Sequence, residues 1–102
     1  MEVAYRLVDL ETRRNLTVEE SPEPPTRQER ELAADQPTGE VIKRERAGEG
    51  EIHVLPVPEE QTEAAVEDVL NDEATLVRAA RLQVERVEIR SETGVVSVRY
   101  LP

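Results

Sequence analysis

The sequence has no cysteine, tryptophan or phenylalanine and only two tyrosines among its 102 residues. Without cysteine the chain forms no disulfide, binds no zinc through thiolates and offers no thiol nucleophile. With so few aromatic residues, any core consists of Val, Leu, Ile and Ala side chains, which bury less area each. A domain of this size with an aliphatic core is expected to be marginally stable, so we expect it to gain stability from a partner subunit.

Long apolar runs are also missing, because no segment approaches the ~20 residues of a membrane-spanning helix. The first residues, MEVAYRLVDLE, begin with an acid rather than with the cationic segment of a signal peptide. We therefore expect a cytoplasmic protein, or a protein of the virion or host cytoplasm if a phage encodes it.

Basic residues are scarce relative to acidic ones. The sequence has 13 Lys and Arg residues and 23 Asp and Glu residues, which gives a net charge of −10. Nucleic acids and anionic membranes bind clustered cations, so we expect no direct contact with either. A protein with a basic surface is the partner that this charge favours.

Residues suited to catalysis are few. The only histidine, His53, lies in the strand-like segment EIHVLPV, without the nucleophile and orienting acid that a catalytic histidine needs. We interpret it as part of a half-exposed strand. Acid pairs one helical turn apart, such as Glu63 and Glu67, could hold Mg²⁺ or Ca²⁺, but no calcium-loop motif or helical Glu-x-x-His accompanies them. We predict no catalytic residue, no metal site and no cofactor.

Alternating apolar residues predict three β-hairpins, over residues 2–20, 40–57 and 83–101. Matching apolar side chains across the strands sets the expected registers. The expected opposing pairs are Leu10 with Leu16 and Val8 with Val18 in the first hairpin, Arg46 with Glu51 and Ile42 with Leu55 in the second, and Val87 with Val98 and Ile89 with Val96 in the third. The second hairpin is expected to turn at Ala47–Gly50.

A Pro- and Glu-rich segment at about 20–38 interrupts this pattern and holds four of the seven prolines. It is typical of an extended loop or arm, which could reach a neighbouring subunit. Within it, TRQE at 26–29 matches a capping box. A short helix from Arg27 to about Asp35 is therefore the alternative to a mobile loop.

The segment from Pro58 to Leu82 has apolar residues at helical spacing and predicts the main helix. Proline fits the first turn, and the acids that follow it lie at the positive end of the helix dipole. Asp72 could instead cap a second short helix, although we predict one helix, kinked at most. The prediction is a single α+β domain over 1–102, a small antiparallel sheet of three hairpins with this helix on one face.

Acidic side chains follow one stripe of the predicted helix and suggest a role. We predict a noncatalytic protein–protein interaction module, a structural or accessory subunit of a larger, phage-like or other assembly that also binds its own copies. Contacts would involve this stripe, the sheet edges and the valine-rich faces of the first and last strands. The predicted partner-binding residues are Glu59, Glu60, Glu63, Glu67, Val96, Val98 and Tyr100.

Three other interpretations of the acidic residues stay open. The stripe could imitate nucleic acid and block a nucleic-acid-binding enzyme. A carboxylate pair could hold a metal ion in an enzyme, which the missing motifs disfavour. The acids could also form a solvated face that only keeps the protein soluble.

Overall fold

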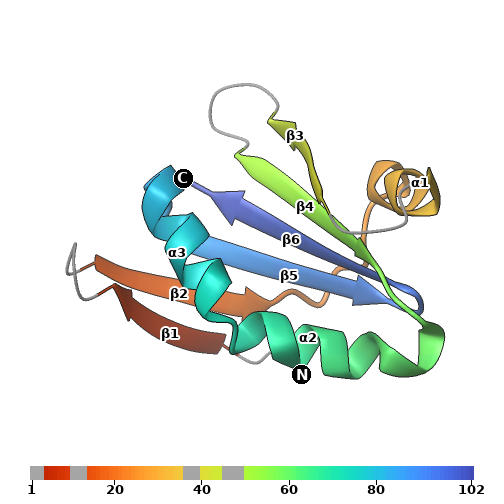
Figure 1. The fold of residues 1–102 in the computed structure, drawn as a ribbon, viewed down its shortest axis with the longest axis horizontal. Helices are drawn as coiled ribbons and strands as arrows, with labels where there is room; N and C mark the ends of the chain where they lie inside the picture. The colour runs from red at the N-terminus through yellow and green to blue at the C-terminus, as the bar shows by residue number, and fades with distance from the viewer. Residues whose placement is uncertain (1–3, 10–13, 36–39, 45–49) are drawn as a thin grey trace.

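The computed structural model describes residues 4–9, 14–35, 40–44 and 50–102. These residues form one mixed sheet with helices packed on both faces (Figure 1). In chain order the elements are β1 (Ala4–Asp9), β2 (Arg14–Glu20), α1 (Arg27–Asp35), β3 (Glu40–Arg44), β4 (Glu51–Pro56), the 3-10 turn η1 (Glu59–Gln61), α2 (Thr62–Leu70), α3 (Glu73–Leu82), β5 (Arg86–Glu92) and β6 (Val95–Leu101). None of the described helices is long and apolar enough to cross a membrane.

The strand order is β1-β2-β5-β6-β4-β3. The four inner strands form the mixed centre, and β1 and β3 extend it at the two edges. The predicted α+β class is confirmed, but the predicted antiparallel sheet is wrong, because β2 and β5 run parallel. That pairing joins strands far apart in the chain, and it aligns Val18 with Val87 so that both face the same core.

The registers differ from those predicted by apolar matching. In the first strand pair Leu7, not Leu10, lies opposite Leu16. In the last pair Ile89 lies opposite Val98, because a loop of only two residues joins Glu92 to Val95. In the second pair Arg44 lies opposite Glu51, whereas Arg46 and most of the predicted turn at Ala47–Gly50 are outside the described residues. Turn length, which sets the register, was misjudged in the β5–β6 hairpin, where four loop residues were expected.

The predicted single helix over 58–82 is also wrong, because it is divided into η1, α2 and α3. Asp72 leaves the helical conformation (φ −82°, ψ 122°) and its side chain accepts a hydrogen bond from the Ala74 amide at 3.0 Å. The Asn71 side chain donates to the Glu67 carbonyl at 2.9 Å. These local hydrogen bonds satisfy backbone groups at the helix ends on both sides of the break. Asp72 therefore caps a second helix, which was the alternative to the single helix.

The main core lies between the sheet and the α2–α3 pair. Alternate residues of β5 and β6 point into it, as the two-residue period of a strand requires. Helix α2 contributes three side chains at helical spacing. The buried members of the core are Leu16, Val18, Val66, Val69, Leu70, Ala79, Val84, Val87, Ile89, Val96, Val98 and Tyr100.

Helix α1 packs on the opposite face of the sheet. Glu29 contacts Ser97 and Arg99, which alternate along β6 with the core residues Val96, Val98 and Tyr100. The capping box is confirmed: the Thr26 hydroxyl accepts from the Glu29 amide at 3.2 Å, and the Glu29 carboxylate accepts from the Thr26 amide at 3.3 Å. This part of the segment 20–38 is therefore a helix docked on its own sheet rather than an extended arm.

Candidate functional site

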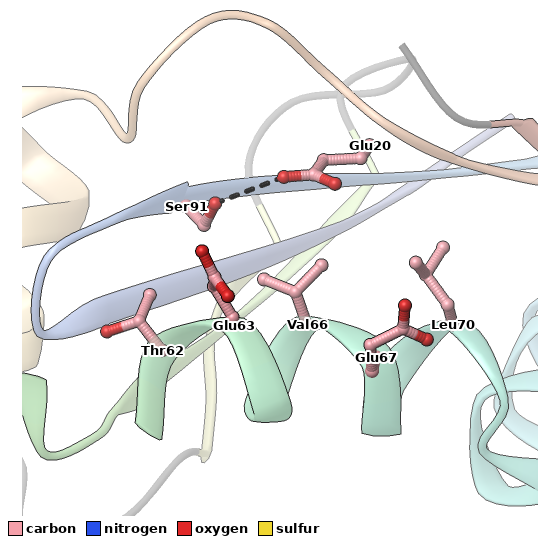
Figure 2. Close-up of a pocket in the computed structure, with 7 residues that line it drawn as sticks. All are labelled: Glu20, Thr62, Glu63, Val66, Glu67, Leu70 and Ser91. Carbon is pink, nitrogen blue, oxygen red and sulfur yellow. Dashed lines mark hydrogen bonds between the residues drawn. The ribbon is translucent and has the colours of Figure 1, made fainter. Parts of the chain in front are cut away.

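A pocket of about 300 Å³ lies between α2 and the neighbouring ends of β2 and β5 (Figure 2). Residues from α2 form one wall, and residues from the two parallel strands form the other. The lining residues are Glu20, Thr62, Glu63, Val66, Glu67, Leu70 and Ser91.

Helical spacing explains the α2 wall. Glu63, Val66, Glu67 and Leu70 are three or four residues apart, so they share one side of the helix. Figure 2 shows the Glu63 carboxylate directed toward Ser91 and the two apolar side chains directed toward the strands. Both apolar residues are buried, so they form an apolar floor beneath the exposed acids.

The opposite wall depends on the parallel pairing of β2 with β5. This pairing places Glu20 at the end of β2 beside Ile89, within reach of Ser91, whose hydroxyl donates to the Glu20 carboxylate at 3.4 Å. Thr62 closes the end of the pocket. Its hydroxyl donates to the Glu59 carbonyl at 3.0 Å and accepts from the Gly94 amide at 3.1 Å, which ties the first turn of α2 to the β5–β6 loop.

Three acids therefore line the pocket, Glu20, Glu63 and Glu67. None of them forms an ion pair with a residue in the described ranges. Glu67 accepts a hydrogen bond from the Asn71 side chain at 3.3 Å, which leaves its charge in place. The pocket thus combines an apolar floor with acids that have no ion-pair partner among the described residues.

The predicted partner-binding residues fall into two groups. Four acids, Glu59, Glu60, Glu63 and Glu67, are exposed on η1 and α2. In contrast, Val96, Val98 and Tyr100 are at most 3% exposed, so the expectation that the last strand presents them to a partner is contradicted. They point toward α2 and α3 because the sheet needs an apolar face there to form a core.

His53 lines a second, smaller cavity of about 160 Å³ beside Tyr100, Thr75 and Arg78. The Arg78 guanidinium lies 6.0 Å from the centre of the Tyr100 ring and donates to the Glu51 carboxylate at 2.9 Å. Burial raises the pKa of the Tyr100 hydroxyl, although the neighbouring Arg78 opposes that shift. Neutral Tyr100 and the paired Arg78 fasten α3 to the strands.

Sequence reasoning missed Glu20, Thr62 and Ser91 as pocket residues. Glu20 lies at a strand end, and Ser91 lies 71 positions further along the chain, so only the parallel pairing brings them together. In the described part of the chain, no group of three or more His, Asp or Glu side chains is arranged to hold a metal ion.

Comparison with curated proteins and with solved structures gives no match. One family does match, described as a family of unknown function (DUF5812), over residues 1–91. Because this match covers most of the 102 residues, the chain belongs to the DUF5812 family.

Proposed function

We propose that this protein is a noncatalytic interaction module that binds a basic segment of another protein. The pocket beside α2 would receive a Lys or Arg side chain of that segment. The observation that supports this proposal is that Glu20, Glu63 and Glu67 line one pocket with an apolar floor and form no ion pair with a cation among the described residues.

The chemistry of the pocket fits a long cationic side chain. Lys and Arg have apolar stems that pack on hydrophobic surface while their charged ends bind polar groups. Val66 and Leu70 would contact the stem. Carboxylates from two sides would bind the charged end, and hydrogen bonds between ionised partners are about twice as strong as neutral ones.

The surface around the pocket extends the same charge. Glu59 and Glu60 are exposed on η1, immediately before α2. A second or third basic residue of the partner would face them. Charges at the rim of an interface mainly accelerate association and add less to affinity, so the pocket residues should determine most of the binding energy.

The geometry favours a protein partner over imitation of nucleic acid. A nucleic-acid mimic would present carboxylates along an exposed surface in place of a phosphate backbone, with no need for an apolar floor. Here three acids surround a cavity with buried Val66 and Leu70 beneath them. A structural or accessory role in a larger assembly, including contacts between copies of the chain, remains part of the proposal.

Binding of a fluorescein-labelled nonapeptide with alternating Arg and Gly, measured by anisotropy, tests the proposal. The variant Glu20→Gln/Glu63→Gln/Glu67→Gln should bind the peptide at least tenfold more weakly. The matched control, Asp68→Asn/Glu73→Gln/Glu85→Gln, removes the same charge from exposed positions that do not line the pocket, and should lose less than threefold. Equal losses in both variants would show that only net charge matters and would refute the pocket.

A further inference from the structure

The segment from Ser21 to Asp35 docks on the sheet through polar contacts, unlike α2 and α3. Its fully enclosed apolar anchors are few, chiefly Pro25 and Ala33. Its best-buried charged group is Glu29, which is only 1% exposed. Burial of a charge is expensive unless the charge is paired, so the docking of this segment depends on what Glu29 meets on the sheet.

The Glu29 carboxylate meets a small set of donors. It accepts hydrogen bonds from the Ser97 hydroxyl and from the Thr26 hydroxyl, the latter at 2.9 Å. It also lies 3.4 Å from the Arg99 guanidinium. Ser97 is fully buried. The capping-box hydrogen bonds with Thr26 fix the position of the Glu29 side chain within its own segment.

Glu29 does not satisfy all the hydrogen-bond donors of the Arg99 guanidinium. Its Nε is buried and has no hydrogen-bond partner in the described part of the structure. A carboxylate approaching in the plane of the guanidinium could engage two of its nitrogens at once, which Glu29 does not do. Ser97 and Arg99 thus form a seat for a carboxylate that Glu29 fills incompletely.

Apart from the backbone hydrogen bond that Ser21 donates to the Ile89 carbonyl at 2.7 Å, the remaining polar contacts of the segment are exposed ion pairs. Arg30 pairs with Glu92 at 3.1 Å, and both side chains are nearly half exposed. Glu23, which is 69% exposed, pairs with Arg90 at 3.0 Å. Exposed pairs of this kind contribute little. Arg90 also donates to Glu88 at 2.7 Å, so it stays paired when Glu23 leaves, and Arg99 is the cation that release would uncover.

We propose that residues 21–35 form a releasable latch over a peptide-binding seat, made of Ser97 and Arg99 with Arg90 at its rim. In the closed state the latch occupies the seat with its own Glu29. In the open state the seat binds an acidic segment of another protein, whose carboxylate replaces that of Glu29. This site lies on the sheet face opposite the α2 pocket and does not depend on the function proposed for that pocket.

Native-state hydrogen exchange on the unaltered chain tests the latch. The hydrogen-bonded amides of α1 should exchange at least 100-fold faster than those of β5 and β6, because the latch opens without unfolding of the sheet. If α1 exchanges at the same rate as β5 and β6, the latch belongs to one cooperative unit with the sheet and the proposal is overturned.

Binding of a labelled peptide with the sequence of residues 21–35 tests the seat, in both the wild-type protein and a Glu29→Gln variant. The variant keeps an amide that can complete the capping box but loses the charge that faces Arg99. It should bind the peptide at least tenfold more tightly than wild type, since its own latch competes less. A peptide carrying Glu31→Gln, an exposed position, should bind like the parent, whereas a peptide carrying Glu29→Gln should not bind.

Failure of the parent peptide to bind, or equal binding of the Glu29→Gln peptide, would overturn the seat. The exchange experiment uses the unaltered chain, so it tests the latch even if the Glu29→Gln protein does not fold. Neither experiment changes Glu20, Glu63 or Glu67. Failure of the latch or of the seat in these two experiments is therefore distinguishable from failure of the function proposed for the α2 pocket.

Discussion

Two glycines with similar backbone conformations should respond very differently to alanine. Gly50 has φ of +79° and Gly94 has φ of +88°, a region that costs an L-residue roughly 1–2 kcal/mol. A Cβ atom at Gly94 would make only an ordinary van der Waals contact, with the Val57 carbonyl oxygen 3.8 Å away. A Cβ atom at Gly50 would lie 1.8 Å from the backbone oxygen of Tyr100, which no side-chain movement can relieve.

The magnitudes follow from this difference. Gly94→Ala should lower the free energy of unfolding by about 1–2 kcal/mol, the conformational penalty alone. Gly50→Ala carries the same penalty and must also push β4 away from β6 where Glu51 pairs with Tyr100. Loss of two ladder hydrogen bonds there, at about 1 kcal/mol each, brings the expected loss to about 3–4 kcal/mol.

Urea denaturation followed by circular dichroism measures both variants against wild type. In thermal melts, 1 kcal/mol corresponds to roughly 4–8 °C in a domain of this size, so the two melting temperatures should separate clearly. If Gly50→Ala is no less stable than Gly94→Ala, then β4 and β6 do not approach each other as described. The Arg78–Glu51 ion pair beside Gly50 would then need another explanation as well.

Two further predictions concern the helix break and the buried tyrosine. Asp72→Ala should destabilise the fold by about 1 kcal/mol, the usual value of an N-cap. Asp72→Asn keeps an acceptor for the Ala74 amide and should change stability by only about a few tenths of a kcal/mol. Equal losses of stability in urea denaturation would exclude the cap. The raised pKa of Tyr100 means that the unfolded chain ionises first as pH rises above about 10. Its contribution to stability is therefore complete below that pH and is lost as pH rises toward the folded pKa. In a Tyr5→Phe background, tyrosinate absorbance should appear at higher pH in the folded protein than in urea, and an unshifted titration would contradict the burial of Tyr100.

The acidic pocket shows where local patterns stop being informative. Spacing along the chain correctly places Glu63 and Glu67 on one side of a helix, because that relation depends only on the helical period. The same pattern says nothing about Glu20 and Ser91, which join the pocket through pairing of β2 with β5. Alternation also groups Val96, Val98 and Tyr100 on one face of a strand. It does not tell whether a partner or the chain's own helices cover that face, and in the fold these side chains are buried in the core.

Local chemistry was enough to predict the α+β class and to raise the capped helix Arg27–Asp35 as the alternative to a loop, because a capping box is satisfied within four residues. It was not enough to predict the mixed sheet, the registers or the buried Glu29. Strand partners compete over the whole chain, and the arrangement that buries the most apolar surface with its polar groups paired prevails over the nearest match. The place of Glu29 against Ser97 and Arg99, like the placement of three acids around one pocket beside α2, follows from that global competition and is visible only in the folded protein.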